Sequence, residues 1–182
     1  MEERILLLAL RGRDAAVLEQ LLERQGLPAS VCDGAASLAA EIEKGAATAI
    51  ITEESLADAD NGALHAWLAR QEPWSDFPFV LLATRRAGKR PKSAMQLLQA
   101  LGNVVVLERP IHSETLASAV TTALRVRGRQ YHARAQLQDL RTAEDLLTQL
   151  NATLEARIVE RTAELSKANN ELMREVGEHE RA

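Results

Sequence analysis

The sequence has 182 residues, enough for one domain of ordinary size and one additional element. Its formal net charge is −4 with both signs interspersed, which argues against nucleic-acid binding because such surfaces carry a basic excess. The single cysteine, Cys32, excludes an internal disulfide and a zinc site built on several cysteines, and it fits a reducing cytosol. No stretch approaches about 20 apolar residues, so no membrane span is expected, and the N-terminus has no basic leader, so no signal peptide is expected. No cofactor or metal site is expected either.

The first part of the chain alternates short apolar runs with amphipathic stretches. The runs are continuous, as in strands buried on both faces, and they cover residues 5–9, 29–32, 47–52, 77–82 and 104–107. Amphipathic helices are expected between and after these runs, the first capped by Asp14 with an apolar stripe at Val17, Leu18, Leu21 and Leu22. Five strands alternating with five helices predict a parallel sheet covered on both faces, in the flavodoxin-like order 2-1-3-4-5.

Two short motifs give this α/β pattern a family resemblance. Glu108-Arg109-Pro110-Ile111 follows the fifth run, and Ala83-Thr84 ends the fourth. Residues 4–127 resemble the receiver domain of two-component systems, which carries Lys-Pro-Phe at the first place and a Ser or Thr near the second. The resemblance also makes Arg109–Pro110 a candidate cis peptide bond, because X–Pro bonds are the common cis sites.

The residues that phosphorylation of a receiver requires are missing. Receivers hold Mg²⁺ with an acidic pair after the first strand, and they use an aspartate after the third strand as the nucleophile; Mg²⁺ prefers such carboxylate oxygens. The positions that correspond to the receiver site are Ala9, Leu10, Arg11, Thr52, Glu53, Thr84, Arg109 and Pro110. The phosphoacceptor position falls on Glu53, or on Thr52 if the register slips by one. We therefore expect a pseudo-receiver domain without catalytic residues over residues 1–127.

Several side chains near this site allow two interpretations from the sequence. Glu53 is either a stand-in for phosphoaspartate that pairs with Arg109 or Arg11, or a solvated acid at the end of a loop. Arg109 is correspondingly a site residue or an ordinary surface arginine. The basic run at residues 85–92 either binds an acidic partner or phosphate, or is a solvated loop.

From Ser113 onward the pattern is helical, and all five prolines lie at or before Pro110. Residues 128–182 show the alternating spacing of three and four that is typical of a coiled coil, with a stutter near Asn169. The seam positions are Leu140, Leu147, Asn151, Leu154, Ile158, Arg161, Leu165, Leu172 and Val176. On periodicity alone, a purely structural coil fits equally well.

Residues 154–165, with Glu160-Arg161-Thr162 at their centre, resemble the signalling helix found between sensor and kinase modules. This resemblance implies a parallel homodimer that relays a conformational change to a PAS or histidine-kinase module. Because the heptad pattern is unfinished at Ala182, we expect that module in further sequence. Together the two resemblances imply the N-terminal part of a bacterial sensor histidine kinase.

Three other functions share parts of this pattern. A stand-alone coiled-coil scaffold shares the same pattern. A nucleic-acid binder would use Arg125, Arg127, Arg129 and Arg134, but the coil has acidic residues throughout. A flavodoxin-like enzyme would need a glycine-rich or hydroxyl-rich phosphate loop, where residues 11–14 read Arg-Gly-Arg-Asp.

Overall fold

The computed structural model describes residues 3–9, 13–58, 61–85 and 92–179. A five-stranded parallel sheet lies at its centre, in the order β2-β1-β3-β4-β5. The strands are β1 (Ile5–Leu8), β2 (Ala29–Val31), β3 (Thr48–Thr52), β4 (Phe79–Thr84) and β5 (Val104–Arg109). This is the sheet order that the sequence predicts, and it is the flavodoxin-like order of receiver domains.

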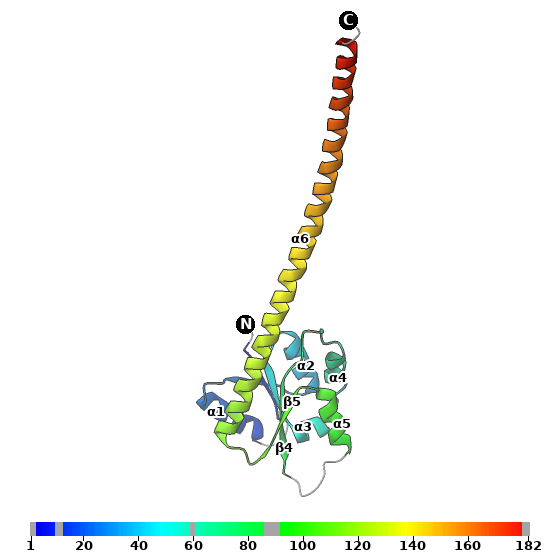
Figure 1. Cartoon of the computed structure of the whole chain (residues 1–182). Helices are drawn as coiled ribbons and strands as arrows, with labels where there is room; N and C mark the ends of the chain where they lie inside the picture. Colours follow the sequence, from blue (N-terminus) through cyan, green and yellow to red (C-terminus); the bar gives the residue numbers. More distant parts are fainter. Residues whose placement is uncertain (1–2, 10–12, 59–60, 86–91, 180–182) are drawn as a thin grey trace. The chain divides into compact units, whose positions relative to one another are not determined.

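Helices cover both faces of the sheet, and each face has its own apolar core (Figure 1). The helices are α1 (Asp14–Arg24), α2 (Ala35–Glu43), α3 (Glu53–Asp58), α4 (Gly62–Ala69), α5 (Lys92–Leu101) and α6 (Ser113–His179). One core joins the sheet to α2, α3, α4 and α5, and the other joins it to α1 and the first turns of α6. The alternation of strand side chains between two cores explains why β1, β3 and β4 read as continuous apolar runs.

The structure differs from the sequence prediction in four local details. A short helix, α3, directly follows β3 and brings the helices of the described residues to six, one more than the five predicted. Asp14 is the first residue of α1 and does not cap it, because its carboxylate binds elsewhere. Val17 is exposed, so the buried stripe of α1 is narrower than predicted. β4 begins at Phe79, since Pro78 has no N–H to donate to a neighbouring strand.

Helix α6 is continuous through 67 residues and belongs to two compact units. The first unit ends at Arg134 and the second comprises residues 135–182. In the first unit α6 buries Leu116, Val120 and Ala123 against the sheet, as the sequence predicts. No helix in the described ranges is long and apolar enough to cross a bilayer.

Candidate functional site

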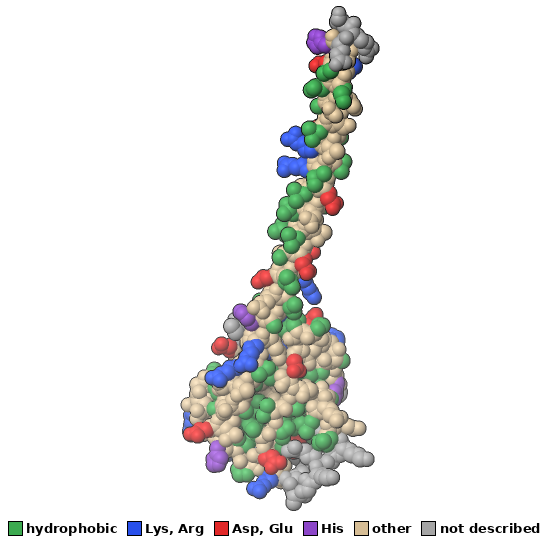
Figure 2. Space-filling view, in the orientation of Figure 1, with side chains coloured by type: hydrophobic (Ala, Val, Ile, Leu, Met, Phe, Trp, Pro, Cys, Tyr) green, Lys and Arg blue, Asp and Glu red, His purple; other side chains and the backbone are tan. Residues whose placement is uncertain are grey.

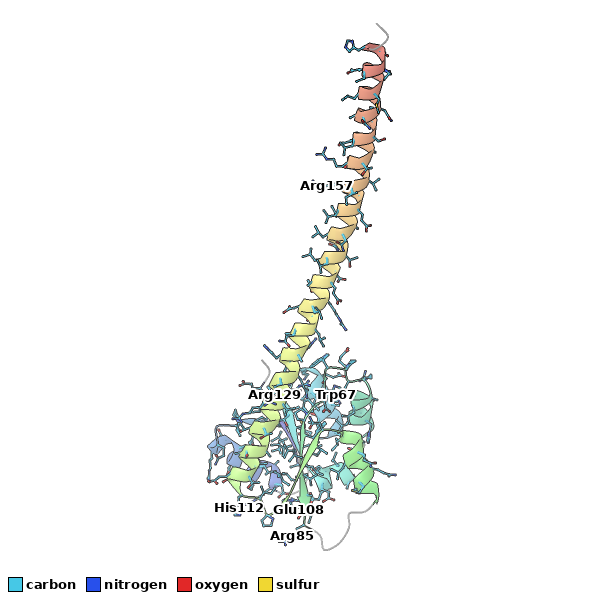
Figure 3. All side chains as sticks on the ribbon, viewed as in Figure 1. Trp67, Arg85, Glu108, His112, Arg129 and Arg157 are labelled. Carbon is cyan, nitrogen blue, oxygen red and sulfur yellow. The ribbon has the colours of Figure 1, made fainter. Side chains whose placement is uncertain are left out.

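The carboxyl-terminal edge of the sheet gathers the positions that the sequence predicts as a degenerate receiver site. β3 ends at Thr52, and α3 starts directly afterwards at Glu53. Thr84 at the end of β4 is the register partner of Arg109 at the end of β5. Figure 3 shows the neighbouring residues Arg85 and Glu108 at this edge, whereas Trp67 lies near the opposite edge.

Arg109 connects three other elements at this edge. Its guanidinium donates hydrogen bonds to Asp14 Oδ2 of α1 at 3.1 Å, to Glu54 Oε1 of α3, and to Thr84 Oγ1 of β4 at 3.0 Å. Thr84 Oγ1 in turn donates to Glu54 Oε1 at 2.5 Å. The side chains of Arg109 and Glu54 are 29% and 25% exposed, so this ion pair is partly shielded from water. Arg109 is therefore a structural centre of the edge and not an isolated surface arginine.

Arg109 pairs with Glu54 and Asp14 and not with Glu53, which corrects one of the two pairings expected for Glu53. The other, with Arg11, lies outside the described residues. Glu53 instead accepts a hydrogen bond from the backbone N–H of Thr84, with 3.1 Å between N and Oε2. Thr52 Oγ1 lies 2.6 Å from Ser55 Oγ and is buried beneath α3. Two carboxylates thus occupy the space between the ends of β3 and β4.

The local environment changes the acidity of Glu54. Burial alone would raise its pKa, but hydrogen bonds from Thr84 and from its own backbone N–H, together with the charge and hydrogen bond of Arg109, hold the pKa below the ordinary value of 4.5. Glu54 is therefore an anion at neutral pH, and its charge is matched by Arg109.

The end of β1 contributes one described position to the predicted site. Ala9 is buried just past β1 and offers no oxygen ligand, while Leu10 and Arg11 lie outside the described residues. The Arg109–Pro110 bond is cis, as the receiver resemblance implies. Within the described ranges, no group of three or more His, Cys, Asp or Glu side chains is placed to hold a metal ion.

Two residues of this edge were absent from the sequence-based site, namely Glu54 and Asp14. Glu54 is adjacent to a predicted site residue, so the acidic pair itself was the available signal. Asp14 is 95 residues from Arg109 in the sequence and had a more ordinary explanation as a helix cap.

The second unit, residues 135–182, carries a different candidate site on α6. Its seam side chains are 47–70% exposed at Leu140, Leu147, Leu154, Ile158, Leu165, Leu172 and Val176. Figure 2 shows hydrophobic side chains recurring along this part of the helix. Exposed apolar side chains at this spacing are typical of a helix that packs against another helix.

Comparison with known proteins adds information on the fold alone. No family model matches the sequence, and neither does any curated protein. A signal receiver domain of a putative Luxo repressor protein from Vibrio parahaemolyticus is similar in structure, with 17% identity, a TM-score of 0.52, and coverage of 77% of this chain and 97% of that one. A sensor protein from Polaromonas sp. JS666 is 22% identical with a TM-score of 0.53, over 69% of this chain and 98% of that one.

A third similar structure is a fusion that contains a trimeric coiled coil from yeast Spc42. It is 14% identical with a TM-score of 0.56, over 81% of this chain and 95% of that one. The sheet order, the helices on both faces and these neighbours agree with one another. The chain therefore has the fold of response regulator receiver domains, followed by a long C-terminal helix.

Proposed function

We propose that this chain is a regulatory and dimerisation module of a two-component sensor histidine kinase. A receiver-like domain over residues 1–127, which is not phosphorylated, passes a signal into a parallel coiled coil over residues 128–182. The coil relays that signal to a PAS or kinase module of the same protein. The observation that carries this proposal is the row of exposed apolar side chains on α6 beyond the receiver fold.

The seam of α6 needs a partner for energetic reasons. Burying one Leu or Ile side chain that is otherwise in water contributes about 1.5–3 kcal/mol. The seam holds several such side chains at heptad spacing, so a second copy of the helix buries them all at once. Asn151 then lies opposite its own copy in a parallel pair, where the two amides can hydrogen-bond; an antiparallel pair need not bring them together.

A disulfide cross-link tests the parallel register. In a Cys32→Ser background, Leu154→Cys is expected to cross-link efficiently on oxidation, because Leu154 meets its own copy in a parallel, in-register seam. Ala156→Cys serves as the matched control, since two residues turn a helix by about 200° and place that side chain on the outer face. Light scattering measures the number of chains in the assembly before oxidation.

Three outcomes contradict the parallel, in-register seam. They are a monomer in light scattering, equal cross-linking at positions 154 and 156, and cross-links that form only between positions far apart in the sequence. A trimer would contradict the dimer while leaving the parallel seam in place.

The proposal that the receiver-like domain is not phosphorylated rests on its carboxyl edge. Ala9 cannot bind Mg²⁺, and the Glu54 carboxylate is engaged by Arg109 and Thr84. Incubation with acetyl phosphate and Mg²⁺ is therefore expected to leave the intact mass unchanged, with an active receiver domain treated in parallel as the positive control. A stoichiometric phosphoryl adduct that disappears in Glu53→Gln or Thr52→Ala would show that the domain retains receiver chemistry.

A further inference from the structure

The scarce aromatic residues of this chain gather at the amino-terminal edge of the sheet, away from the carboxyl-edge site. The sequence contains two Trp, one Tyr and two Phe residues. Ring contacts join Trp67 to Phe77, Phe77 to Phe79, and Trp74 to Tyr131. All of these rings therefore belong to two groups, one of Trp67, Phe77 and Phe79 and the other of Trp74 and Tyr131.

Arg127 of α6 bridges these two groups. Its guanidinium carbon lies 5.2 Å from the ring centroids of Trp74 and Phe77, and 4.7 Å from that of Tyr131. The residue is only 5% exposed. Such close contact between a cation and aromatic faces is attractive, and the attraction grows when water is excluded.

The charge of Arg127 is not neutralised within the part of the chain that the structure describes. Its Nη1 donates to Ser75 Oγ and to Gln130 Oε1, both at 2.8 Å, and both acceptors are neutral. Its Nε is buried and has no hydrogen-bond acceptor among the described residues. Buried charges in proteins are normally paired, because an unpaired charge in a low-dielectric site is costly. The rings offset part of this cost, and an anion would offset the remainder.

A hollow of about 370 Å³ adjoins this arginine. Its walls include the aromatic side chains Trp67, Trp74 and Tyr131 and the arginines Arg70, Arg127 and Arg134. Its volume falls within the range of small-molecule pockets, about 300–1,000 Å³.

The balance of charge around the hollow is positive. Glu43, which also lines it, is paired with Arg70 at 3.2 Å, so these two charges cancel. The guanidinium carbon of Arg134 lies 4.7 Å from the ring centroid of Trp74. The remaining charges of the lining are the cations of Arg127 and Arg134 and the carboxylate of Glu72.

We propose that this hollow binds a small aromatic carboxylate. The carboxylate group pairs with Arg127 and Arg134, and the ring of the ligand packs against the tryptophans. Guanidinium groups suit a carboxylate because their planar donors match its two oxygens. The apolar walls favour a ligand with a ring over acetate or inorganic phosphate, which have the charge without the apolar body.

The site also has a direct connection to α6. Arg127, Tyr131 and Arg134 occupy successive turns at the end of the first unit, so a bound ligand stabilises this stretch of helix. Such a ligand is then an input signal for the proposed coiled-coil output. That role rests on the proposed function, whereas binding itself rests on the hollow alone.

Tryptophan fluorescence tests binding without a label, because both tryptophans of the chain line the hollow. Benzoate and 1-naphthoate are the probes, titrated into the full chain, with calorimetry as a second measurement. Saturable binding of these probes is expected. Benzamide keeps the ring without the charge, acetate and phosphate keep a charge without the ring, and all three are expected to bind at least about tenfold more weakly, equal to about 1.4 kcal/mol.

Three variants locate the site on the arginines. Arg127→Gln is expected to weaken benzoate binding about tenfold or more, and the more exposed Arg134→Gln about threefold, since each removes charge-assisted hydrogen bonds. Arg129→Gln is the matched control. It removes the same charge from the same helix, but two residues along, and Arg129 does not line the hollow. If Arg127→Gln does not fold, Arg134→Gln and Arg129→Gln still give the comparison.

Four results would overturn the assignment. They are the absence of a saturable signal with either carboxylate, binding of benzamide as tight as that of benzoate, tighter binding of phosphate than of benzoate, and equal weakening of benzoate binding by Arg129→Gln and Arg134→Gln. A failure of the cysteine cross-link at position 154 would count against the proposed function and would leave this binding assignment standing.

Discussion

At the scale of single residues, Arg109 connects the carboxyl edge to three other elements. It joins α1 through Asp14, α3 through Glu54 and β4 through Thr84. A hydrogen bond to a charged group contributes about 1.5–3 kcal/mol when it is shielded, and less when water screens it. Because the Arg109–Glu54 pair is partly shielded, we expect a contribution of about 1–2 kcal/mol to the free energy of unfolding.

Glu54→Gln tests this contribution and its dependence on pH. The folded-state pKa of Glu54 is lowered, so its stabilisation is fully present above the ordinary value of 4.5 and is lost as pH falls through the lower folded value. Urea unfolding followed by tryptophan fluorescence should therefore show a deficit of about 1–2 kcal/mol in Glu54→Gln near neutral pH. The deficit should shrink below pH 4.5.

Glu53→Gln is the matched control for that experiment. Its amide oxygen still accepts the hydrogen bond from Thr84 N–H, so we expect a change below about 0.5 kcal/mol. A larger loss of stability in Glu53→Gln than in Glu54→Gln would contradict this prediction, because it would show that Glu53 stabilises the edge more than Glu54 does.

The sequence could identify this edge but not the pairing within it. The receiver resemblance of the motifs that follow two apolar runs singled out Thr84 and Arg109, and the structure makes them register partners. The choice between Glu53 and Glu54 depends on where β3 ends and α3 begins. Successive residues of a helix point about 100° apart, so a shift of one residue changes which carboxylate faces Arg109. No sequence pattern marks that boundary to one residue.

At the scale of elements, α6 carries one predicted seam position that would oppose tight pairing. Arg161 lies on the seam and forms an ion pair with Glu164 of the same helix, at 3.0 Å. Both side chains are largely exposed, so the pair itself contributes little. In a parallel dimer Arg161 would meet its own copy, which makes this segment the weakest part of the coil and a suitable place for a switch.

Replacing Arg161 with Leu is expected to stabilise the coil, because it exchanges two facing cations for two apolar side chains. The measurement is the melting temperature of the helical circular-dichroism signal, which should rise. Lys167→Leu, which removes a positive charge away from the seam, is the control and should leave the melting temperature nearly unchanged. An equal rise in both variants would trace the effect to net charge instead of the seam.

The strands and the long helix were predictable because burial on two faces and heptad spacing leave periodic signals. α3 was not, because its six residues are too few to show a period. The heptad pattern does not determine the number of helices that pair, since polar seam positions such as Asn151 alter the preference.

At the scale of the whole molecule, the two units obtain their stability from different sources. The first unit buries two apolar cores within one chain, whereas the predicted seam of residues 135–179 is exposed in the single chain. Association stabilises only the part that requires the partner, and this stabilisation depends on concentration.

Two spectroscopic signals should therefore respond differently to protein concentration. Both tryptophans lie in the first unit, so the thermal transition seen by their fluorescence should stay nearly constant. The transition seen by helical circular dichroism should move to higher temperature as the concentration is raised. Coincident transitions that move together would show that the receiver-like domain also depends on association.

The hydrogen bonds of Glu53 and Glu54 have a consequence for timing. A phosphorylated aspartate has a limited lifetime, because its acyl phosphate hydrolyses and the domain then returns to its unphosphorylated state. A carboxylate that belongs to the chain has no such lifetime, and no phosphatase can remove it. A state held by Glu54, Thr84 and Arg109 persists until those contacts dissociate. Under the proposed function, the duration of a signal through this domain would be set by how long a ligand or partner stays bound, and not by the rate of a bond-breaking reaction.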